Sequence, residues 1–259
     1  PAVMGIINCT PDSFYEGSRS AGVKESLSMA EQMLGEGADI LDLGAYSSRP
    51  GASTVSPEEE ISRLLPSVEA ILKKFPKAII SVDTFRSEVA HRCLDAGALI
   101  INDISAGDLD ENMNAVVASY GATYIMMHMR GNPQNMMQQT DYDNLLIEIK
   151  DYFEKRIKKC KEQGVSSLII DPGFGFSKTL DQNYELLRQI EDLKSFNLPL
   201  LVGISRKSMI YKLLEQEPRD VLSATSALHL FALQKGADIL RVHDVKEARQ
   251  MIRLAAKLF

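Results

Sequence analysis

The sequence predicts an α/β fold, a single (β/α)8 TIM barrel with long loops at the C-terminal face of its strands. Short apolar runs that end in a polar residue recur eight times along the 259 residues, and ten or more residues of helical periodicity follow each run. Runs buried on both faces and separated by helices indicate parallel strands, because a parallel crossover needs a dozen or more residues. Eight such units match a closed barrel, whereas a doubly wound sheet more often has about five or six strands.

The predicted strands cover residues 3–8, 39–44, 78–83, 98–103, 123–128, 167–171, 200–205 and 238–243. The helical segment before four of these strands ends at a glycine followed by alanine, as expected for glycine at the C′ position of a helix. These glycines are Gly37, Gly97, Gly121 and Gly236. The clearest internal repeat pairs GADILDLG at 37–44 with GADILRVH at 236–243, which is one strand and helix unit in each case.

Three long connections interrupt this rhythm, at residues 10–23, 45–57 and 129–142. Each lies between the end of a strand and the start of the next helix, where barrels place the residues that carry their chemistry. No linker rich in Pro, Gly and Ser divides the chain. Residues 1–259 are therefore expected to form one barrel domain.

Composition excludes several classes of protein. The longest apolar runs are about six residues, far short of the ~20 that cross a bilayer, so no membrane association is expected. Pro1 is not followed by a basic and apolar leader, which favours a cytoplasmic location. Three cysteines without C-x-x-C spacing argue against a disulfide framework or a thiolate metal site. A net charge of −6, with no long basic run, argues against a general nucleic-acid binder.

Polar or charged side chains stand at or just after the end of every predicted strand. They are Asn8, Asp42, Asp83, Asn102 with Asp103, His128, Asp171, Lys207, and Arg241 with His243. A barrel gathers the carboxyl ends of its strands at one mouth, so we expect this ring to form the site. A single Asp after an apolar run is more often a helix cap or a turn residue. Asp83 and Asp103 also fit such caps, and the pattern leaves open an outward-pointing Asp42.

Several familiar motifs are absent or incomplete. The run DPGFGF at 171–176 lacks the third glycine of a dinucleotide fingerprint, because Lys178 occupies that position. The run GISRKS at 203–208 has Arg206 where a P-loop needs glycine. The sequence has neither H-E-x-x-H nor G-x-S-x-G, which argues against a zinc hydrolase and an esterase. A hard ion bound by oxygen ligands remains open.

Eight segments, in order and spanning nearly the whole chain, resemble the dihydropteroate synthase family of pterin-binding barrels. They are NCTPDSF at 8–14, SSRPG at 47–51, SVDT at 81–84, NDI at 102–104, MHM at 127–129, DPGFGF at 171–176, SRK at 205–207 and RVHDV at 241–245. The resemblance implies a transferase of folate biosynthesis that sulfonamides inhibit. It would condense 6-hydroxymethyl-7,8-dihydropterin pyrophosphate with p-aminobenzoate, giving 7,8-dihydropteroate and pyrophosphate.

The resemblance also assigns residues to the pterin. The implied pterin site is Asp83, Asn102, Met126, Asp171, Phe176 and Lys207. Asp171 is expected to hold the 2-amino and N3 edge of the ring, because that edge resembles a guanidinium that a carboxylate binds with two hydrogen bonds. Asp83 and Asn102 are expected to bind other ring nitrogens, and Lys207 the ring carbonyl oxygen.

The leaving group and the second substrate have implied residues as well. Asn8, Arg241 and His243 are expected to bind the pyrophosphate, with Asn8 also a ligand of Mg2+, an ion that accepts few protein ligands. The implied p-aminobenzoate slot is Phe14, Arg49, Pro50, Phe176, Lys207 and Ser208. The implied catalytic set is Asp83, Lys207, Arg241, His243 and Arg49. Loops 10–23 and 45–57 are expected to exclude water from the reaction.

Other interpretations remain open. Tyr46-Ser47-Ser48 departs from the Glu-Ser-Thr that is more usual in the family, which leaves the role of Tyr46 undefined. A pterin-binding methyltransferase of the same superfamily would share Asp83, Asn102 and Asp171 but needs neither loop motif. A barrel that binds a pterin without turning it over is a second alternative. Relatives are commonly homodimers through their last helices, and residues 224–233 and 252–259 offer apolar area for such an interface.

Overall fold

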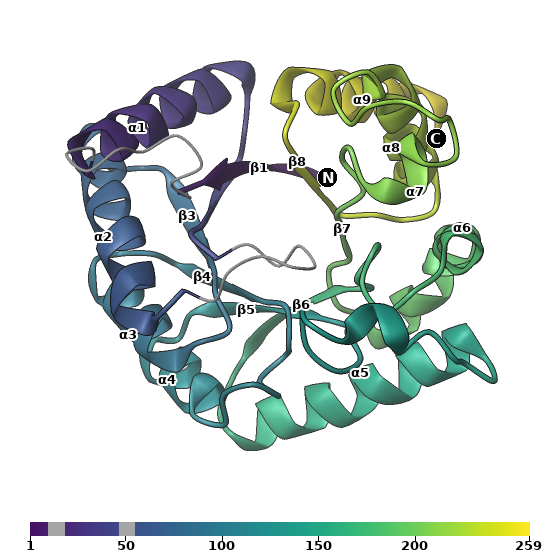
Figure 1. Ribbon diagram of the computed structural model, residues 1–259, viewed down its shortest axis with the longest axis horizontal. Coiled ribbons are helices and arrows are strands. Elements are labelled where there is room, and N and C mark those ends of the chain that lie inside the picture. The colour runs from purple at the N-terminus through teal and green to yellow at the C-terminus, as the bar shows by residue number, and fades with distance from the viewer. Residues whose placement is uncertain (10–18, 47–54) are drawn as a thin grey trace.

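The computed structural model describes residues 1–9, 19–46 and 55–259 and contains eight parallel strands surrounded by helices (Figure 1). The strands are β1 (Ala2–Asn8), β2 (Ile40–Gly44), β3 (Ile79–Asp83), β4 (Ile100–Asp103), β5 (Thr123–Met127), β6 (Ser167–Asp171), β7 (Leu201–Val202) and β8 (Ile239–Val242). Their order in the sheet is β6-β5-β4-β3-β2-β1-β8-β7. The predicted (β/α)8 barrel is therefore confirmed, with strand ends that differ by a few residues from the predicted ones.

A helix or helical turn follows each strand in the described part of the chain. The α-helices are α1 (Arg19–Glu36), α2 (Pro57–Lys74), α3 (Ser87–Asp95), α4 (Met113–Tyr120), α5 (Leu145–Glu162), α6 (Leu180–Gln189), α7 (Ser208–Tyr211), α8 (Leu222–Gln234) and α9 (Val245–Leu258). Two 3-10 segments, η1 (Met136–Gln138) and η2 (Ile190–Phe196), complete the set. None of these helices is long and apolar enough to cross a membrane.

The barrel is nearly closed, and its seam lies between β6 and β7. Seven pairs of neighbouring strands are joined by parallel ladders. Across the seam, the only bridge between described residues is that of Ile170 with Leu200. The predicted strand at 200–205 has ladder pairing over only Leu201–Val202, so the chain leaves the sheet early at this point.

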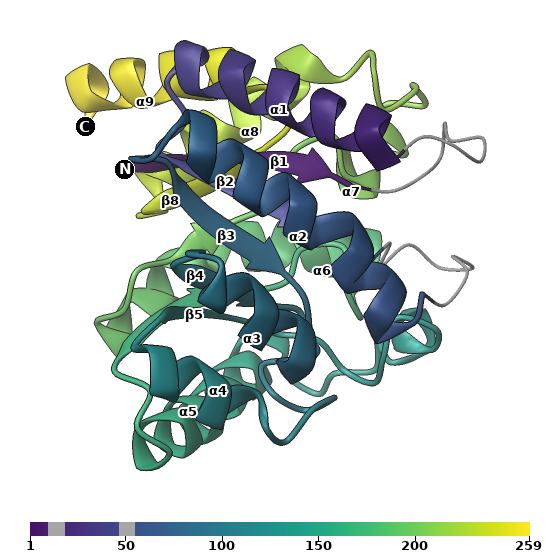
Figure 2. The same ribbon diagram turned by 90° about the vertical axis from the view of Figure 1, so that its left-hand side faces the viewer.

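The helices cover the outside of the strands (Figure 2), and alternation along each strand divides the core into two layers. One set of strand residues packs outward against the helices, as Leu41 and Tyr124 do in the main apolar cluster. The alternate set fills the inside of the barrel with a smaller cluster that includes Met4, Ile100 and Ile169. The inner positions nearer the carboxyl ends of the strands are polar, which directs the chemistry to that mouth.

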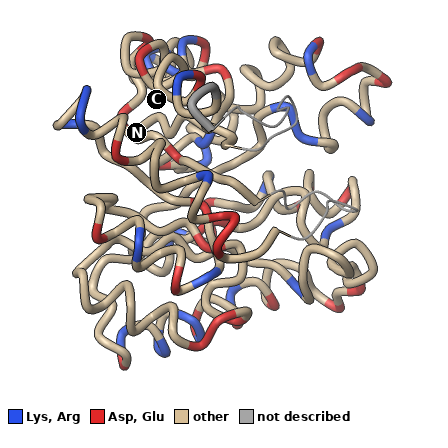
Figure 3. The backbone as a smooth tube through the Cα atoms, turned by 60° about the vertical axis from the view of Figure 1, so that its left-hand side comes forward, with Lys and Arg blue, Asp and Glu red and all other residues tan. Residues whose placement is uncertain are grey.

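Local sequence signals explain where the helices begin and end. Ser56 caps α2 by accepting a hydrogen bond from the backbone N–H of Glu59. Thr179 and Gln182 form a reciprocal capping box at the start of α6. Gly37 and Gly236, predicted at C′ positions, have φ of 99° and 90°, in the left-handed region that favours glycine. Acidic and basic positions are interspersed along the outer helices (Figure 3), the usual pattern of a solvated surface.

Candidate active site

The strand registers bring the predicted polar ring to one end of the barrel. Asp83 lies opposite Gly44 on one side and Asn102 on the other. Gly44 leaves the space for this carboxylate, because a Cβ at Gly44 would come within 3.3 Å of the Asp83 Cβ. Asp171 ends β6, and its Oδ2 would be 4.0 Å from a Cβ at Gly203, just beyond β7. The mouth is therefore lined by side chains that lie far apart in the sequence, from Asp83 to Asp171.

Arg241 is the centre of a charged network in this mouth. Its Nε lies 2.6 Å from Asp42 Oδ2, and its Nη2 lies 2.7 Å from Asp83 Oδ2. Asn102 donates a hydrogen bond of 3.1 Å to the same oxygen of Asp42. Four strands thus contribute one residue each to a single hydrogen-bonded group, which fixes the orientation of the guanidinium.

The structure resolves the orientation of Asp42. This residue is fully buried and points into the barrel, in phase with Ile40 and Gly44, so an outward orientation is wrong. Its second oxygen, Oδ1, has no hydrogen-bond partner among the described residues. A buried carboxylate with one free oxygen has capacity for a further donor at this point of the site.

Electrostatics in the network are strongly perturbed. Burial raises the pKa of Asp83 to about 7, with Arg241 acting against that rise and Asp42 adding to it. For Arg241, burial lowers the pKa, but the carboxylates of Asp42 and Asp83 outweigh it, and the net shift is upward. Arg241 therefore stays charged, whereas Asp83 can change its protonation near neutral pH.

The opposite side of the mouth is built by the segment that follows β6. Asp171 accepts a hydrogen bond of 2.8 Å from the backbone N–H of Gly173. Lys207 Nζ binds the carbonyl oxygen of Phe174 and lies 4.7 Å from the centre of the Phe176 ring. These contacts place an acid, a cation and an aromatic ring on one side of the mouth.

Burial perturbs Asp171 and Lys207 in opposite directions. It raises the pKa of Asp171, against the lowering effect of the Lys207 charge. It lowers the pKa of Lys207 to about 8, against the raising effect of Asp171 and together with the repulsion of Arg241. Perturbed carboxyl and amino groups facing one mouth are typical of a functional site.

Asn8, His243 and Ser208 occupy the rim. Asn8 ends β1 with an exposed side chain. His243 follows β8, and its Nδ1 lies 3.1 Å from Ser205 Oγ, which also accepts a hydrogen bond from the His243 backbone N–H. Ser208 is the first residue of α7, directly after Lys207. All three are within the mouth region, on the side formed by β1, β7 and β8.

Met126 lies elsewhere. The expectation that it contacts the pterin does not fit the structure, because Met126 packs outward in the helix-facing core, with its Sδ 3.5 Å from Cys160 Sγ on α5. Met127, its neighbour in the strand, faces the mouth in an apolar cluster. The other members of that cluster are Ile104, Met129 and Met136, with Phe85 and Phe176 packed against it. Strict alternation from Ile125 was the signal that identifies Met127.

Some members of the predicted ring have local structural roles. Asp103 accepts hydrogen bonds from the backbone of Ser105 and Gly107, and from the Tyr124 hydroxyl at 2.6 Å. It therefore organises the loop after β4 and does not cap the following helix, whose N-cap residue is Asn112. Of the helical histidines, His91 is hydrogen-bonded to Tyr120, whereas buried His229 leaves Nε2 without a partner among the described residues.

Phe14, Arg49 and Pro50 lie outside the described residues, so their predicted roles stay predictions. Both ends of the second loop, however, are described. Tyr46 packs edge-on against Phe85, with ring centroids 5.1 Å apart. Arg86 lies 5.4 Å from the Tyr46 ring and donates a hydrogen bond of 2.6 Å to the carbonyl of Val55. Arg86 thus contacts both the residue before the undescribed part of this loop, Tyr46, and the residue after it, Val55.

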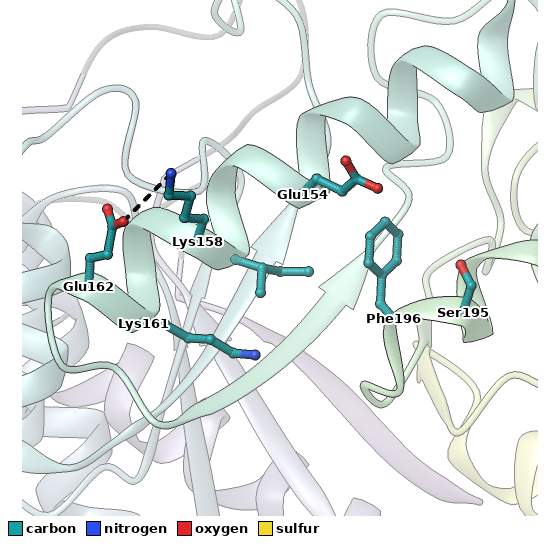
Figure 4. Close-up of a pocket in the computed structure, with 7 residues that line it drawn as sticks. Glu154, Lys158, Lys161, Glu162, Ser195 and Phe196 are labelled. Carbon is teal, nitrogen blue, oxygen red and sulfur yellow. Dashed lines mark ion pairs between the residues drawn. The ribbon is translucent and has the colours of Figure 1, made fainter.

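A separate surface hollow of about 490 Å³ lies between α5 and η2 (Figure 4). Glu154, Phe196 and Ser195 face it, and Lys158 pairs with Glu162 at 3.9 Å along its edge. It lies on the outside of the helix layer, apart from the polar ring. Within the described residues, no group of three His, Cys, Asp or Glu side chains is placed to hold a metal ion.

Comparison with known proteins identifies similar chains. The family model for pterin binding enzymes matches residues 4–243. A dihydropteroate synthase from Synechocystis is 44% identical over 260 residues, covering 99% of this chain and 90% of that protein.

Solved structures agree with this result. The Yersinia pestis dihydropteroate synthase, in a complex with a sulfonamide drug, has a TM-score of 0.93 and 40% identity, covering 99% of this chain and 94% of that one. The Thermus thermophilus dihydropteroate synthase, in complex with 4-aminobenzoate, has a TM-score of 0.88 and 38% identity, covering 100% and 94%.

Proposed function

Because this chain belongs to the dihydropteroate synthase family of pterin-binding enzymes, we propose that its barrel mouth joins p-aminobenzoate to 6-hydroxymethyl-7,8-dihydropterin pyrophosphate. The products are 7,8-dihydropteroate and pyrophosphate, so the enzyme is a transferase of folate biosynthesis. The observation that carries the residue assignments is the inward convergence of Asp171, Lys207, Asp83 and Arg241 on one mouth.

The pterin ring fits between the two sides of this mouth. Asp171 is aimed by the Gly173 backbone and offers its other carboxylate oxygen to the 2-amino and N3 edge. Lys207 reaches the ring carbonyl, and Asp83 with Asn102 reads the remaining ring nitrogens. Met127 takes the apolar position beside the ring that the sequence had suggested for Met126.

The pyrophosphate is assigned to Arg241, His243 and Asn8. In the ligand-free network Arg241 is neutralised by Asp42 and Asp83, so a bound pyrophosphate competes with carboxylates of the same sign. Moving Arg241 onto the leaving group frees Asp83 to face the positive charge that develops on the pterin.

Magnesium is part of this proposal through Asn8. Mg2+ prefers oxygen ligands and keeps most of its coordination for phosphate and water, so a single exposed amide oxygen at the rim fits it. When bound, the ion would neutralise charge on the departing pyrophosphate. The described residues include no competing cluster of acidic or thiolate ligands, which is consistent with a site completed by the substrate.

The reaction breaks the bond between the pterin methylene carbon and the pyrophosphate oxygen, whose electrons leave with the pyrophosphate. The lone pair of the aromatic amine forms the new carbon–nitrogen bond, and one amine proton passes to solvent. The amine is neutral at physiological pH, so no general base is required. Asp83 stabilises the positive methylene electrostatically, and Phe14, Arg49, Pro50, Phe176, Lys207 and Ser208 hold the p-aminobenzoate.

One assay tests this function. The protein is incubated with the pterin pyrophosphate, p-aminobenzoate and Mg2+, and both dihydropteroate and released pyrophosphate are measured. Equal amounts of the two products are expected. Pterin binding without either product would instead favour a binding protein, and transfer of a methyl group from a methylated folate would favour the methyltransferase alternative.

We propose further that residues 1–259 act as one domain, in the cytoplasm, as a homodimer. The last helix carries exposed apolar side chains at Leu254 and Leu258, which with Phe259 suit an interface between copies. Light scattering measures this directly: twice the mass of the 28.7 kDa chain is expected, and a monomer at micromolar concentration would contradict the homodimer.

A further inference from the structure

Lys178 is a buried lysine for which the proposed reaction has no use. It is only 2% exposed, although it lies just after the segment that carries Phe176. Its Nζ is 3.0 Å from the carbonyl oxygen of Gly173, 3.1 Å from that of Phe176 and 3.0 Å from Nδ1 of His128. Burying an ammonium group is costly unless its donors are satisfied. The three acceptors around Nζ match the three N–H donors of the ammonium, so its burial is fully compensated by hydrogen bonds.

The protonation states of the two side chains match this geometry. Burial lowers the pKa of His128 well below its usual value, and the charges of Lys178 and Arg130 lower it further. The ring is therefore neutral, and Nδ1 can accept a hydrogen from the ammonium. Burial also lowers the pKa of Lys178 to about 7, against the attraction of Asp171 and with the repulsion of Lys207 and Arg130.

The same contacts hold in either charge state of the lysine. The ammonium donates to two carbonyls and to Nδ1 of His128. The neutral amine still donates to both carbonyls, and its lone pair accepts from Nδ1 once His128 carries its hydrogen there. The other groups that face Lys178 are Asp171, Lys207 and Arg130, none of which takes the place of His128 in this contact.

The two carbonyls belong to residues whose other atoms face the site. The backbone N–H of Gly173 orients Asp171, at 2.8 Å, and the ring of Phe176 lies beside the Lys207 ammonium. Gly173 has φ of 71°, and a Cβ there would come within 2.0 Å of the His128 carbonyl oxygen, so strand and loop touch at this point. Ser177, the residue before Lys178, has φ of 44°, a strained value for a side chain that needs support from its surroundings.

We propose that Lys178 and His128 are positioning residues for the pterin ring. Together they form a buried clamp, defined as Lys178 Nζ with Gly173 O, Phe176 O and His128 Nδ1. The clamp holds the turn whose Gly173 N–H orients the Asp171 carboxylate and which carries the Phe176 ring. This inference rests on the proposed function, which assigns the 2-amino and N3 edge of the pterin to Asp171.

The test separates the two substrate regions of the mouth. Affinities are measured by calorimetry for 6-hydroxymethylpterin and, separately, for inorganic pyrophosphate with Mg2+. Lys178→Met keeps a long apolar chain but removes every donor, and it is expected to raise the Kd of the pterin at least tenfold. The Kd of pyrophosphate is expected to change less than twofold, because β1 and β8 carry those contacts.

Matched variants make the result specific. His128→Asn places an amide near the former Nδ1 and is expected to keep the pterin Kd within threefold of the parent, whereas His128→Leu is expected to raise it tenfold. Lys194→Met removes a lysine that pairs with Asp238 at 2.5 Å, outside the site, and is expected to leave both affinities unchanged. If Lys178→Met does not fold, the proposal is tested by comparing the pterin Kd of His128→Asn with that of His128→Leu.

Two results would overturn the clamp: an unchanged pterin Kd in Lys178→Met, or equal losses of pterin and pyrophosphate affinity. Equal pterin affinities of His128→Asn and His128→Leu would overturn it as well. Failure of the proposed function has a different signature, because the parent protein itself would then fail to bind the pterin or to form dihydropteroate.

Discussion

Arg241 and Lys178 are buried cations on opposite sides of the same mouth, and different kinds of partner hold them. Arg241 pairs with two carboxylates, from Asp42 and Asp83. Lys178 contacts two backbone carbonyls and a neutral ring. A substrate anion can replace a carboxylate partner at little electrostatic cost, whereas the carbonyl partners of Lys178 belong to the buried turn at Gly173 and Phe176 and move only with it. The comparison therefore separates an exchangeable cation, suited to reaction, from a fixed cation, suited to positioning.

The largest expected effect lies on the side of the mouth that contains Lys178 and Asp171. Asp171→Ala leaves the 2-amino and N3 edge of the pterin without a partner in a buried pocket, which costs on the order of 2–5 kcal/mol. Calorimetry with 6-hydroxymethylpterin should show loss of most or all binding. Asp151→Ala, on the exposed face of α5, is the control and should bind normally. Full affinity in Asp171→Ala would reduce Asp171 to a turn residue.

A substitution of Arg241, the exchangeable cation, should affect a different ligand, pyrophosphate. Arg241→Gln removes the charge that binds pyrophosphate, so the Kd of pyrophosphate with Mg2+ should rise by roughly 30-fold or more, which corresponds to about 2 kcal/mol. The Kd of the pterin alone should stay within about threefold. Arg249→Gln serves as the control, since Arg249 pairs with Asp39 away from the mouth. Equal losses for both ligands would remove the distinction between the two cations.

The fixed cation should also appear in the pH dependence of stability. Lys178 has a pKa of about 7 in the folded protein and about 10.5 in the unfolded chain, so between these values the unfolded chain binds more protons. The free energy of unfolding of the parent therefore gains a contribution that rises with pH in this window. Lys178→Met lacks it.

The size of that difference follows from linkage. Relative to the parent, Lys178→Met should lose about 2 kcal/mol of stability between pH 7.5 and 9.0, because each pH unit corresponds to about 1.4 kcal/mol. Urea unfolding at the two pH values measures it. Lys207 titrates in the same range and its charge acts on Lys178, so Lys207→Met and the double variant are measured alongside to separate its contribution. Parallel pH dependences would show that Lys178 stays charged across the window in the folded protein, as it does in the unfolded chain.

The smallest effect is expected at the rim. Asn8→Ala removes one amide oxygen from the proposed Mg2+ site, where pyrophosphate and water supply the other ligands. The Kd of pyrophosphate should rise about tenfold, or about 1.4 kcal/mol, only when Mg2+ is present. Binding of the pterin without pyrophosphate should be unaffected. A loss that is independent of Mg2+ would mean that Asn8 contacts the pyrophosphate directly.

Much of the fold and part of the site could be predicted because their signals are local. Apolar runs that end in polar residues, with helical periodicity between them, identify eight strands and the mouth. The same alternation is ambiguous at Met126 and Met127, since both are apolar, and only the phase from Ile125 distinguishes them. For Asp42, a lone acidic residue within an apolar strand left both orientations open, and the structure shows that it shares the phase of the inward Ile40.

The buried clamp could not be predicted in the same way. Its two side chains, Lys178 and His128, are separated by 50 residues, and no periodicity connects them. In the sequence analysis, Lys178 was noted only because it occupies the position of the third glycine in a dinucleotide-binding motif. Its partners are backbone carbonyls of a turn, whose directions depend on positive φ values at Gly173 and Ser177 rather than on residue type. Such contacts emerge only when the loop is placed in space.

The weakly paired seam between β6 and β7 implies that substrate binding also stabilises the barrel. Among the described residues, Ile170–Leu200 is the only pairing at this junction, whereas every other pair of neighbouring strands has at least two, so its amides should exchange with deuterium fastest among the strands. Asp171 lies on one edge of the junction and Lys207 follows the other. A pterin bound by both Asp171 and Lys207 would connect the two edges of the junction. Its binding should therefore slow deuterium uptake at residues 168–171 and 200–203. The ligand would thus complete a barrel that the chain itself leaves partly open.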